Sequence, residues 1–225
     1  SPLLNLLKTQ RLFSLILWGT PGCGKTTLAR LIATKVNAQF IELSAVTSGI
    51  KEIKETVEQA RQALRSGQKT ILFIDEIHRI NKNIEEILYP ALEDYVLDII
   101  IGKGPTAKSI RLNLPKFTLI GATTKAGSLT TPLRDRFGIV HRLELYSDQD
   151  LVTIIKRSAR ILDINIDEES SLEIARRSRG TPRIANRLLK RVRDYATVLG
   201  NGSIDLNIAK TALNKLEIDE LGLDE

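Results

Sequence analysis

Eight consecutive residues set the architecture of this chain: Gly19-Thr20-Pro21-Gly22-Cys23-Gly24-Lys25-Thr26. They fit the pattern G-x-x-x-x-G-K-[ST], which is typical of a loop that binds phosphate groups. An apolar run from Phe13 to Trp18 precedes the loop and predicts a buried strand, and the segment from Thr27 to Ala33 predicts a helix after it. Because the motif works between a strand and a helix, these flanks favour it over a chance glycine-rich turn.

The chemistry of this loop predicts a nucleotide site. Glycines allow backbone N–H groups to close around phosphate oxygens, and the N-terminus of the following helix adds a partial positive charge. Lys25 would reach the β- and γ-phosphates of ATP, and the Thr26 hydroxyl would bind Mg²⁺. We expect these residues to contact the nucleotide: Gly19, Thr20, Pro21, Gly22, Cys23, Gly24, Lys25, Thr26 and Thr27.

A second apolar run, Thr70 to Ile74, ends in the acidic pair Asp75-Glu76. A strand buried on both faces places its last side chains at the carboxyl edge of the sheet, beside a bound nucleotide. Asp75 would hold Mg²⁺ directly or through water, and Glu76 would orient and polarise the attacking water. The alternative is two solvated acids, and the upstream loop favours catalysis. His78 could sense the nucleotide state, but we favour a packed loop residue.

Repeated strand and helix patterns predict an α/β fold, with a parallel sheet between helices over residues 1–146. Pro90 lies inside one expected helix and should kink it. The expected elements are a lead-in helix at Ser1–Thr9, strands at Phe40–Leu43, Phe117–Ala122 and Ile139–Leu145, and helices at Ile50–Leu64 and Ile84–Leu92.

After Tyr146 the pattern changes to helices alone, and we expect residues 147–225 to form a separate helical lid domain. Capping residues start its helices near Ser147, Asp167 and Asp205, and Thr181-Pro182 starts another.

Two β-branched segments, Tyr95 to Ile101 and Ser109 to Leu114, predict a protruding β-hairpin. They are separated by a turn that contains Gly102 and Gly104. Three consecutive isoleucines, Ile99 to Ile101, indicate a partner surface on this hairpin. Packing of the hairpin on its own domain is an equal alternative.

Composition limits the class of protein. The chain has 225 residues, a net charge of +6 and a pI near 9.5, so either a nucleic-acid partner or a solvated basic surface fits it. No apolar run approaches the roughly 20 residues of a membrane span. One cysteine excludes an internal disulfide and fits a reducing compartment. With no visible signal peptide, we expect a cytoplasmic location.

The order of these parts resembles the AAA+ ATPases. More specific stretches are Asp75 to Asn81, Glu85 to Tyr95, Ile120 to Thr124, Pro132 to Gly138 and Arg179 to Arg187. These stretches resemble the RuvB family of Holliday-junction branch-migration motors, and this likeness covers roughly residues 75–225. Leu17-Trp18-Gly19 and the segment from Phe40 to Ile53 are more similar to the RarA/MgsA family of replication-associated AAA+ ATPases, which makes the chain a mosaic.

The RuvB resemblance implies further site residues. Thr124 matches sensor 1, which positions water near the γ-phosphate, and Arg183 matches sensor 2, which contacts the γ-phosphate within the same subunit. Arg136 is the expected arginine finger toward the ATP of a neighbouring subunit, and Arg134 is the less favoured choice. The hairpin Tyr95–Leu114 matches the feature that docks the RuvA partner.

The resemblance implies a Mg²⁺-dependent ATPase of a ring motor, hexameric in the full protein, that drives Holliday junction branch migration in DNA recombination and repair. The chain also resembles a fragment, since RuvB has adenine-holding residues before Ser1 and a winged-helix DNA-binding domain after Glu225. Weak DNA binding is therefore expected. Two alternatives stay open: a RarA-like ATPase at stalled replication forks, and an ATP-binding assembly module with little turnover.

Overall fold

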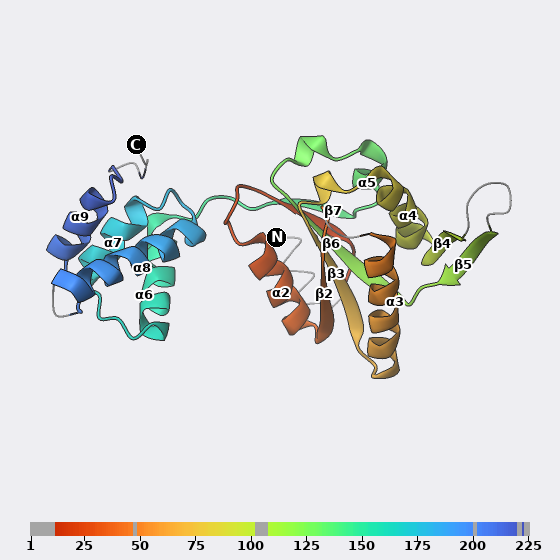
Figure 1. Cartoon of the computed structure of the whole chain (residues 1–225), viewed down its shortest axis with the longest axis horizontal. Helices are drawn as coiled ribbons and strands as arrows, with labels where there is room; N and C mark the ends of the chain where they lie inside the picture. Colours follow the sequence, from red (N-terminus) through yellow and green to blue (C-terminus); the bar gives the residue numbers. More distant parts are fainter. Residues whose placement is uncertain (1–11, 47–48, 102–107, 200–201, 220–221, 223–225) are drawn as a thin grey trace. The chain divides into compact units, whose positions relative to one another are not determined.

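The computed structural model describes residues 12–46, 49–101, 108–199, 202–219 and 222 (Figure 1). The expected lead-in helix at Ser1–Thr9 lies outside these residues. By Cα packing the chain divides into two compact units. One contains Lys25–Arg142 and the chain up to Gly19, and the other contains the loop Thr20–Gly24 with the chain from Leu143 onward. None of the described helices is long and apolar enough to cross a membrane.

In the first unit, five parallel strands form one sheet in the order β2-β3-β6-β1-β7. This confirms the predicted α/β fold with a parallel sheet. Two strands are shorter than the sequence predicted, because β1 begins at Leu15 and β7 ends at Arg142. The strands are β1 (Leu15–Trp18), β2 (Ala38–Ser44), β3 (Lys69–Asp75), β6 (Phe117–Thr123) and β7 (Ile139–Arg142).

Side chains alternate along each strand, so the two faces of the sheet carry different cores. Phe73 of β3 is fully buried on one face and stacks with Phe40 of β2, with ring centroids 5.6 Å apart. Arg30 of α2 (Lys25–Lys35) lies over the Phe40 ring, at 4.8 Å from its centroid. Helix α2 therefore covers this face.

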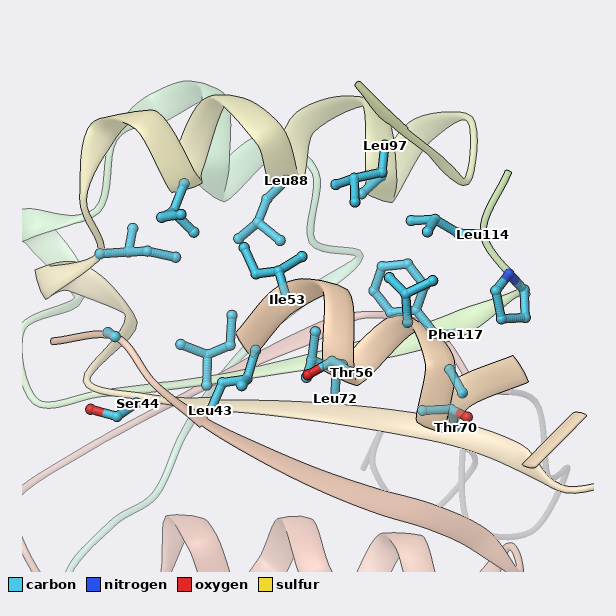
Figure 2. Close-up of a pocket in the computed structure, with 18 residues that line it drawn as sticks. Leu43, Ser44, Ile53, Thr56, Thr70, Leu72, Leu88, Leu97, Leu114 and Phe117 are labelled. Carbon is cyan, nitrogen blue, oxygen red and sulfur yellow. The ribbon is translucent and has the colours of Figure 1, made fainter. Parts of the chain in front are cut away.

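The opposite face presents Leu72 and Ile74 of β3 to α3 (Ile50–Arg65) and α4 (Lys82–Glu93). Between these helices and the sheet lies an apolar cavity of ≈ 60 Å³ (Figure 2). Apolar side chains such as Leu88 line most of it. None of the expected nucleotide-binding residues lines this cavity.

Short elements connect these layers at the carboxyl edge of the sheet. Residues Ile77–Arg79 form the single 3-10 turn η1 directly after β3, and Ala126–Ser128 form a second such turn, η3. Helix α5 (Thr131–Asp135) starts at Thr130, whose hydroxyl accepts the N–H of Leu133 at 3.3 Å. Helix α5 ends at Asp135, and Arg136 is its C-cap.

A separate two-stranded antiparallel sheet, β4 (Val96–Ile101) and β5 (Lys108–Asn113), lies at the position of the expected hairpin. Asp98 accepts two hydrogen bonds from Arg111, at 2.8 and 2.9 Å, and this pair holds the pKa of Asp98 below its ordinary value. Leu97 is buried against Ile53 of α3, so the base of the hairpin packs on its own unit. The side chains of Ile99 to Ile101 lie outside the description, and their partner surface stays a prediction.

The second unit is built on four helices around one apolar core. Three of them begin at a polar cap: Ser147, Asp167 and Asp205 each accept a backbone N–H. Such a cap satisfies one of the donors that a helix start leaves unpaired. The helices are α6 (Asp148–Ile161), α7 (Glu168–Arg176), α8 (Pro182–Leu199) and α9 (Leu206–Lys215).

Arg177 joins two of these helices from inside the second unit. Its guanidinium donates to the Glu173 carboxylate at 2.9 and 2.7 Å, to Asn214 Oδ1 at 2.9 Å and to the Ile218 carbonyl at 2.7 Å. The Arg177 side chain is only 6% exposed. A buried cation needs this degree of pairing, because desolvation of an unpaired charge is costly. Arg177 therefore serves structure rather than solubility.

Candidate functional site

The carboxyl ends of three neighbouring strands carry the predicted nucleotide residues. Gly19 follows β1, Asp75 ends β3 and Thr124 follows β6, which lies between β1 and β3 in the sheet. The N–H of Gly19 donates to the Thr123 carbonyl at 3.2 Å and ties the start of the loop to the end of β6. Open α/β sheets bind ligands at this edge, where the chain order reverses.

The loop backbone requires glycine at two positions. Gly22 has a φ of +80° and Gly24 a φ of +97°, a left-handed region that side-chain-bearing residues rarely occupy. In the same unit, a Cβ atom built on Gly22 would lie 2.7 Å from Cβ of Arg183 and 2.9 Å from Cγ2 of Thr181. Cys23 between the two glycines is fully buried. The loop is therefore a close-packed backbone feature, as a phosphate cradle must be.

Lys25 closes the loop from its far end. It is the first residue of α2, and its side chain curls back so that Nζ donates to the Gly19 carbonyl at 3.0 Å. Lys25 is buried, Thr26 is half-buried and Thr27 is exposed. A lysine ammonium and the N–H groups of a helix start thus meet at one loop, a combination that suits phosphate oxygens.

Asp75 and Thr26 are the residues expected to bind Mg²⁺, which needs few ligands from the protein. Asp75 is half-buried at the end of β3, and its Oδ1 accepts the N–H of Glu76 at 3.1 Å. Among the described residues, no group of three or more His, Cys, Asp and Glu side chains could hold a metal by itself. Mg²⁺ usually takes one or two protein carboxylates and completes its shell with waters and substrate phosphates. A threonine hydroxyl and one carboxylate are donors of this kind.

Glu76 is fixed by its backbone and by two side chains. It occupies the left-handed region at φ 48° and ψ 44°, which is uncommon for a residue other than glycine. The Thr124 hydroxyl donates to Glu76 Oε2 at 2.9 Å. The same oxygen lies 3.2 Å from Nδ1 of His78, which in turn lies 2.9 Å from Oγ1 of Thr123. Two residues predicted separately for water activation, Glu76 and Thr124, are thus in direct contact.

Arg136 is held within its own chain. Its Nη2 lies 2.8 Å from Glu93 Oε1, its Nη1 donates to the Pro132 carbonyl at 2.7 Å, and its guanidinium lies over the Tyr89 ring at 4.3 Å from the centroid. Arg134, the less favoured finger, is exposed. A role for Arg136 in a neighbouring subunit therefore requires its guanidinium to leave Glu93.

A carboxylate on α4 anchors the helix that precedes Arg136. Glu85 is buried and accepts hydrogen bonds from the hydroxyl groups of Tyr89, at 2.6 Å, and Thr130, the cap of α5. The bond to Glu85 raises the pKa of Tyr89 above its ordinary value. The position of Arg136 is consequently set by α4, which follows the Asp75-Glu76 strand in the chain.

Comparison with known families decides what this site belongs to. Residues 6–143 match the family described as the Holliday junction DNA helicase RuvB P-loop domain. Residues 146–219 match the RuvB AAA lid domain. The chain belongs to the RuvB family. Because the P-loop match begins at residue 6, RuvB similarity includes the first third of the chain, which the sequence alone likened to RarA/MgsA.

Solved RuvB structures agree with this assignment. A structure of Thermotoga maritima RuvB, titled as a Holliday junction branch migration motor, is 38% identical with a TM-score of 0.82. The match covers 99% of this chain and 68% of that one. A mutant of Thermotoga maritima RuvB is 39% identical with a TM-score of 0.83, over 99% of this chain and 69% of that one. The RuvB fold thus extends over both units.

Sequence analysis did not single out Thr123, and it considered His78 as a nucleotide sensor before favouring a packed loop residue. Thr123 was treated only as a strand end, although it binds both His78 and the N–H of Lys125, at 3.0 Å. His78 is packed, as favoured from the sequence, with a side chain that is 10% exposed. It also touches Glu76, which the packing interpretation did not foresee. The spacing of two residues between Glu76 and His78 is the signal that could have indicated this contact.

Proposed function

We propose that this RuvB family member hydrolyses ATP with Mg²⁺ and works as a subunit of a ring motor that moves Holliday junctions. The single observation that carries the proposal is the Glu76–Thr124 hydrogen bond of 2.9 Å at the sheet edge where the phosphate-binding loop begins. That bond joins a carboxylate able to polarise water to a hydroxyl able to position it. The family match supports Holliday-junction DNA as the substrate class.

In this proposal each residue has one task. Lys25 and the loop from Gly19 to Thr27 hold the phosphates, after Lys25 exchanges the Gly19 carbonyl for phosphate oxygens. Thr26 and Asp75 hold Mg²⁺, whose charge offsets that of the β- and γ-phosphates. Glu76 accepts a proton from the attacking water, and Thr124 fixes the carboxylate.

Two further residues would report the state of the nucleotide. Arg183 would contact the γ-phosphate in the same subunit, and the closeness of its Cβ to Gly22 of the loop supports this role. Arg136 would reach the ATP of the neighbouring subunit and stabilise charge in the transition state. Loss of the γ-phosphate removes both contacts, which gives the ATP and ADP states the differential contacts that a motor needs.

Variants of the site test hydrolysis itself. Lys25→Ala should abolish ATP binding, because the loop loses its only lysine and the charge that meets the phosphates. Glu76→Gln should bind ATP normally and lose turnover, since an amide does not accept the proton. ATP affinity by titration calorimetry and phosphate release measure the two effects. Undiminished affinity in the first variant, or retained hydrolysis in the second, would refute the assigned roles.

Mixing wild-type and variant subunits tests whether the ATPase works as a ring of cooperating subunits. The ATPase rate per subunit should rise with protein concentration, and Arg136→Ala subunits should poison wild-type subunits in mixtures. Loss of a finger slows phosphoryl transfer by about 10³- to 10⁵-fold. Arg134→Ala is the matched control because it removes the neighbouring exposed arginine. A flat, low rate that ignores both variants would instead favour an ATP-binding assembly module.

The partners of this motor are also proposals. The hairpin of β4 and β5 would dock a RuvA-like protein, and the family match to a Holliday junction helicase indicates four-way DNA as the substrate. The net charge of +6 favours contact with phosphate backbones without selecting a DNA structure.

A further inference from the structure

His78 lies closer to the proposed chemistry than a packing role requires. It is the middle residue of η1 (Ile77–Arg79), two positions after Glu76. Its Nδ1 lies 2.9 Å from Thr123 Oγ1 and 3.2 Å from Glu76 Oε2. Thr123 is fully buried, so this nitrogen faces one buried hydroxyl and one carboxylate oxygen.

The groups around His78 Nδ1 offer it two oxygens. The Thr124 hydroxyl already donates to Glu76 Oε2, and Thr123 Oγ1 already accepts the N–H of Lys125 at 3.0 Å. A carboxylate oxygen accepts and does not donate, so the 3.2 Å contact between Nδ1 and Glu76 Oε2 is a hydrogen bond in the tautomer that carries the ring proton on Nδ1. The positioning role uses this tautomer.

We propose that His78 is a positioning residue for Glu76. With Thr124 it supplies two donors to one carboxylate oxygen, Oε2, and the second oxygen, Oε1, is left to accept the proton of the attacking water. This inference rests on the proposed ATPase function, in which Glu76 is the base. A base must be aimed to within hydrogen-bond reach of its water, so the residue that aims it affects turnover rather than ATP binding.

The backbone supports the same role. The left-handed conformation of Glu76 is one that a residue other than glycine adopts only when its surroundings enforce it. Here η1 enforces it, because the Arg79 N–H donates to the Glu76 carbonyl at 2.8 Å and Ile77 is fully buried against Gly121 of β6. One rigid turn thus sets the directions of both Glu76 and His78.

Strand β6, on which η1 packs, also carries the residues that contact Glu76 and His78. Gly121, Thr123 and the following Thr124 all belong to the end of β6 or directly follow it. Glu76 and His78 are therefore aligned against a single strand, and a displacement of η1 along β6 would break the contacts of Glu76 with Thr124 and of His78 with Thr123 together.

A matched pair of substitutions separates positioning from packing. His78→Asn keeps an N–H donor the same number of bonds from Cα as Nδ1, and His78→Leu fills similar space without a donor. ATP affinity, turnover at saturating ATP and urea denaturation are measured for each. Loss of one hydrogen bond to a charged group corresponds to about 10- to 100-fold in rate. We expect this fall in kcat for His78→Leu with unchanged ATP affinity, and a kcat within about threefold of wild type for His78→Asn.

The background of Glu76→Gln completes the test. There, His78→Leu should cause no further loss, since the group it positions is gone. Normal kcat in His78→Leu, or equal losses in the leucine and asparagine variants, would overturn the positioning role while leaving the ATPase proposal intact. Full activity in Glu76→Gln would overturn both. If His78→Leu fails to fold, His78→Gln, whose amide lies one bond farther out, replaces it with the same expected loss.

Discussion

Gly121→Ala tests whether packing under η1 fixes the proposed catalytic turn. A Cβ atom at Gly121 would lie 2.9 Å from Cδ1 and 3.2 Å from Cγ2 of Ile77, both closer than normal carbon contacts. Ile77 is fully buried, so its side chain has no solvent to move into. Overpacking of this kind costs about 1–3 kcal/mol in a core. We expect that loss in the free energy of unfolding, together with a lower kcat, because Glu76 and His78 flank Ile77.

A compensating substitution makes the magnitude specific. Ile77→Val deletes Cδ1, the atom at 2.9 Å, and by itself should cost about 0.5–1.5 kcal/mol. In the double variant the deleted methyl makes room for the added one, so the two costs should not add. We expect the double variant to be more stable than the sum predicts by about 1 kcal/mol.

Urea denaturation followed by tryptophan fluorescence is the suitable assay. Trp18 is the only tryptophan in the chain and lies in β1, where it pairs with Thr123 of β6. The signal therefore reports on the first unit. Additive costs within about 0.3 kcal/mol, or a Gly121→Ala variant as stable and active as wild type, would refute the packing argument.

Two further substitutions address stability in each unit. Arg177→Met should cost about 3–5 kcal/mol, because it leaves the part-buried Glu173 carboxylate without its cation. Arg176→Met, at the exposed neighbouring position, should change the free energy of unfolding in urea by less than about 0.5 kcal/mol. Equal effects of the two substitutions would contradict the role of the Arg177 network. Val57→Ile adds one methylene toward the ≈ 60 Å³ cavity under α3 and should raise the free energy of unfolding of the first unit by about 0.8 kcal/mol. A lower free energy of unfolding would mean that the cavity does not accept the added methylene.

The sequence predicted the fold well where local patterns suffice. The apolar run before Gly19 and the run before Asp75 became β1 and β3, since strands buried on both faces are apolar throughout. Capping residues such as Asp167 placed the helices of the second unit correctly. The predicted end of β7 was wrong, because the apolar pattern continues to Leu145 although the pairing of β7 with β1 ends at Arg142.

The candidate site was less predictable because its contacts join distant positions. His78 and Thr123 are 45 residues apart, and no local pattern indicates that their side chains meet. The left-handed backbone of Glu76 is equally hidden, since the residue type gives no sign of it. The attachment of Arg136 to Glu93 depends on how α5 follows η3, which is a matter of tertiary packing.

The position of β6 also has a consequence for synthesis on the ribosome. Leu15 of β1 pairs with Ile120 of β6 and Ile139 of β7, so its partners emerge 105 and 124 residues later. At about 5–20 residues per second, the apolar strand β1 waits roughly 5–21 s for its first neighbour, β6. By contrast β2 and β3 can pair early, since Ala38 pairs with Lys69. A nascent chain that ends before β6 would contain both the phosphate-binding loop and the Asp75-Glu76 pair. It would lack the strand that lies between β1 and β3, which are roughly 10 Å apart in the folded sheet.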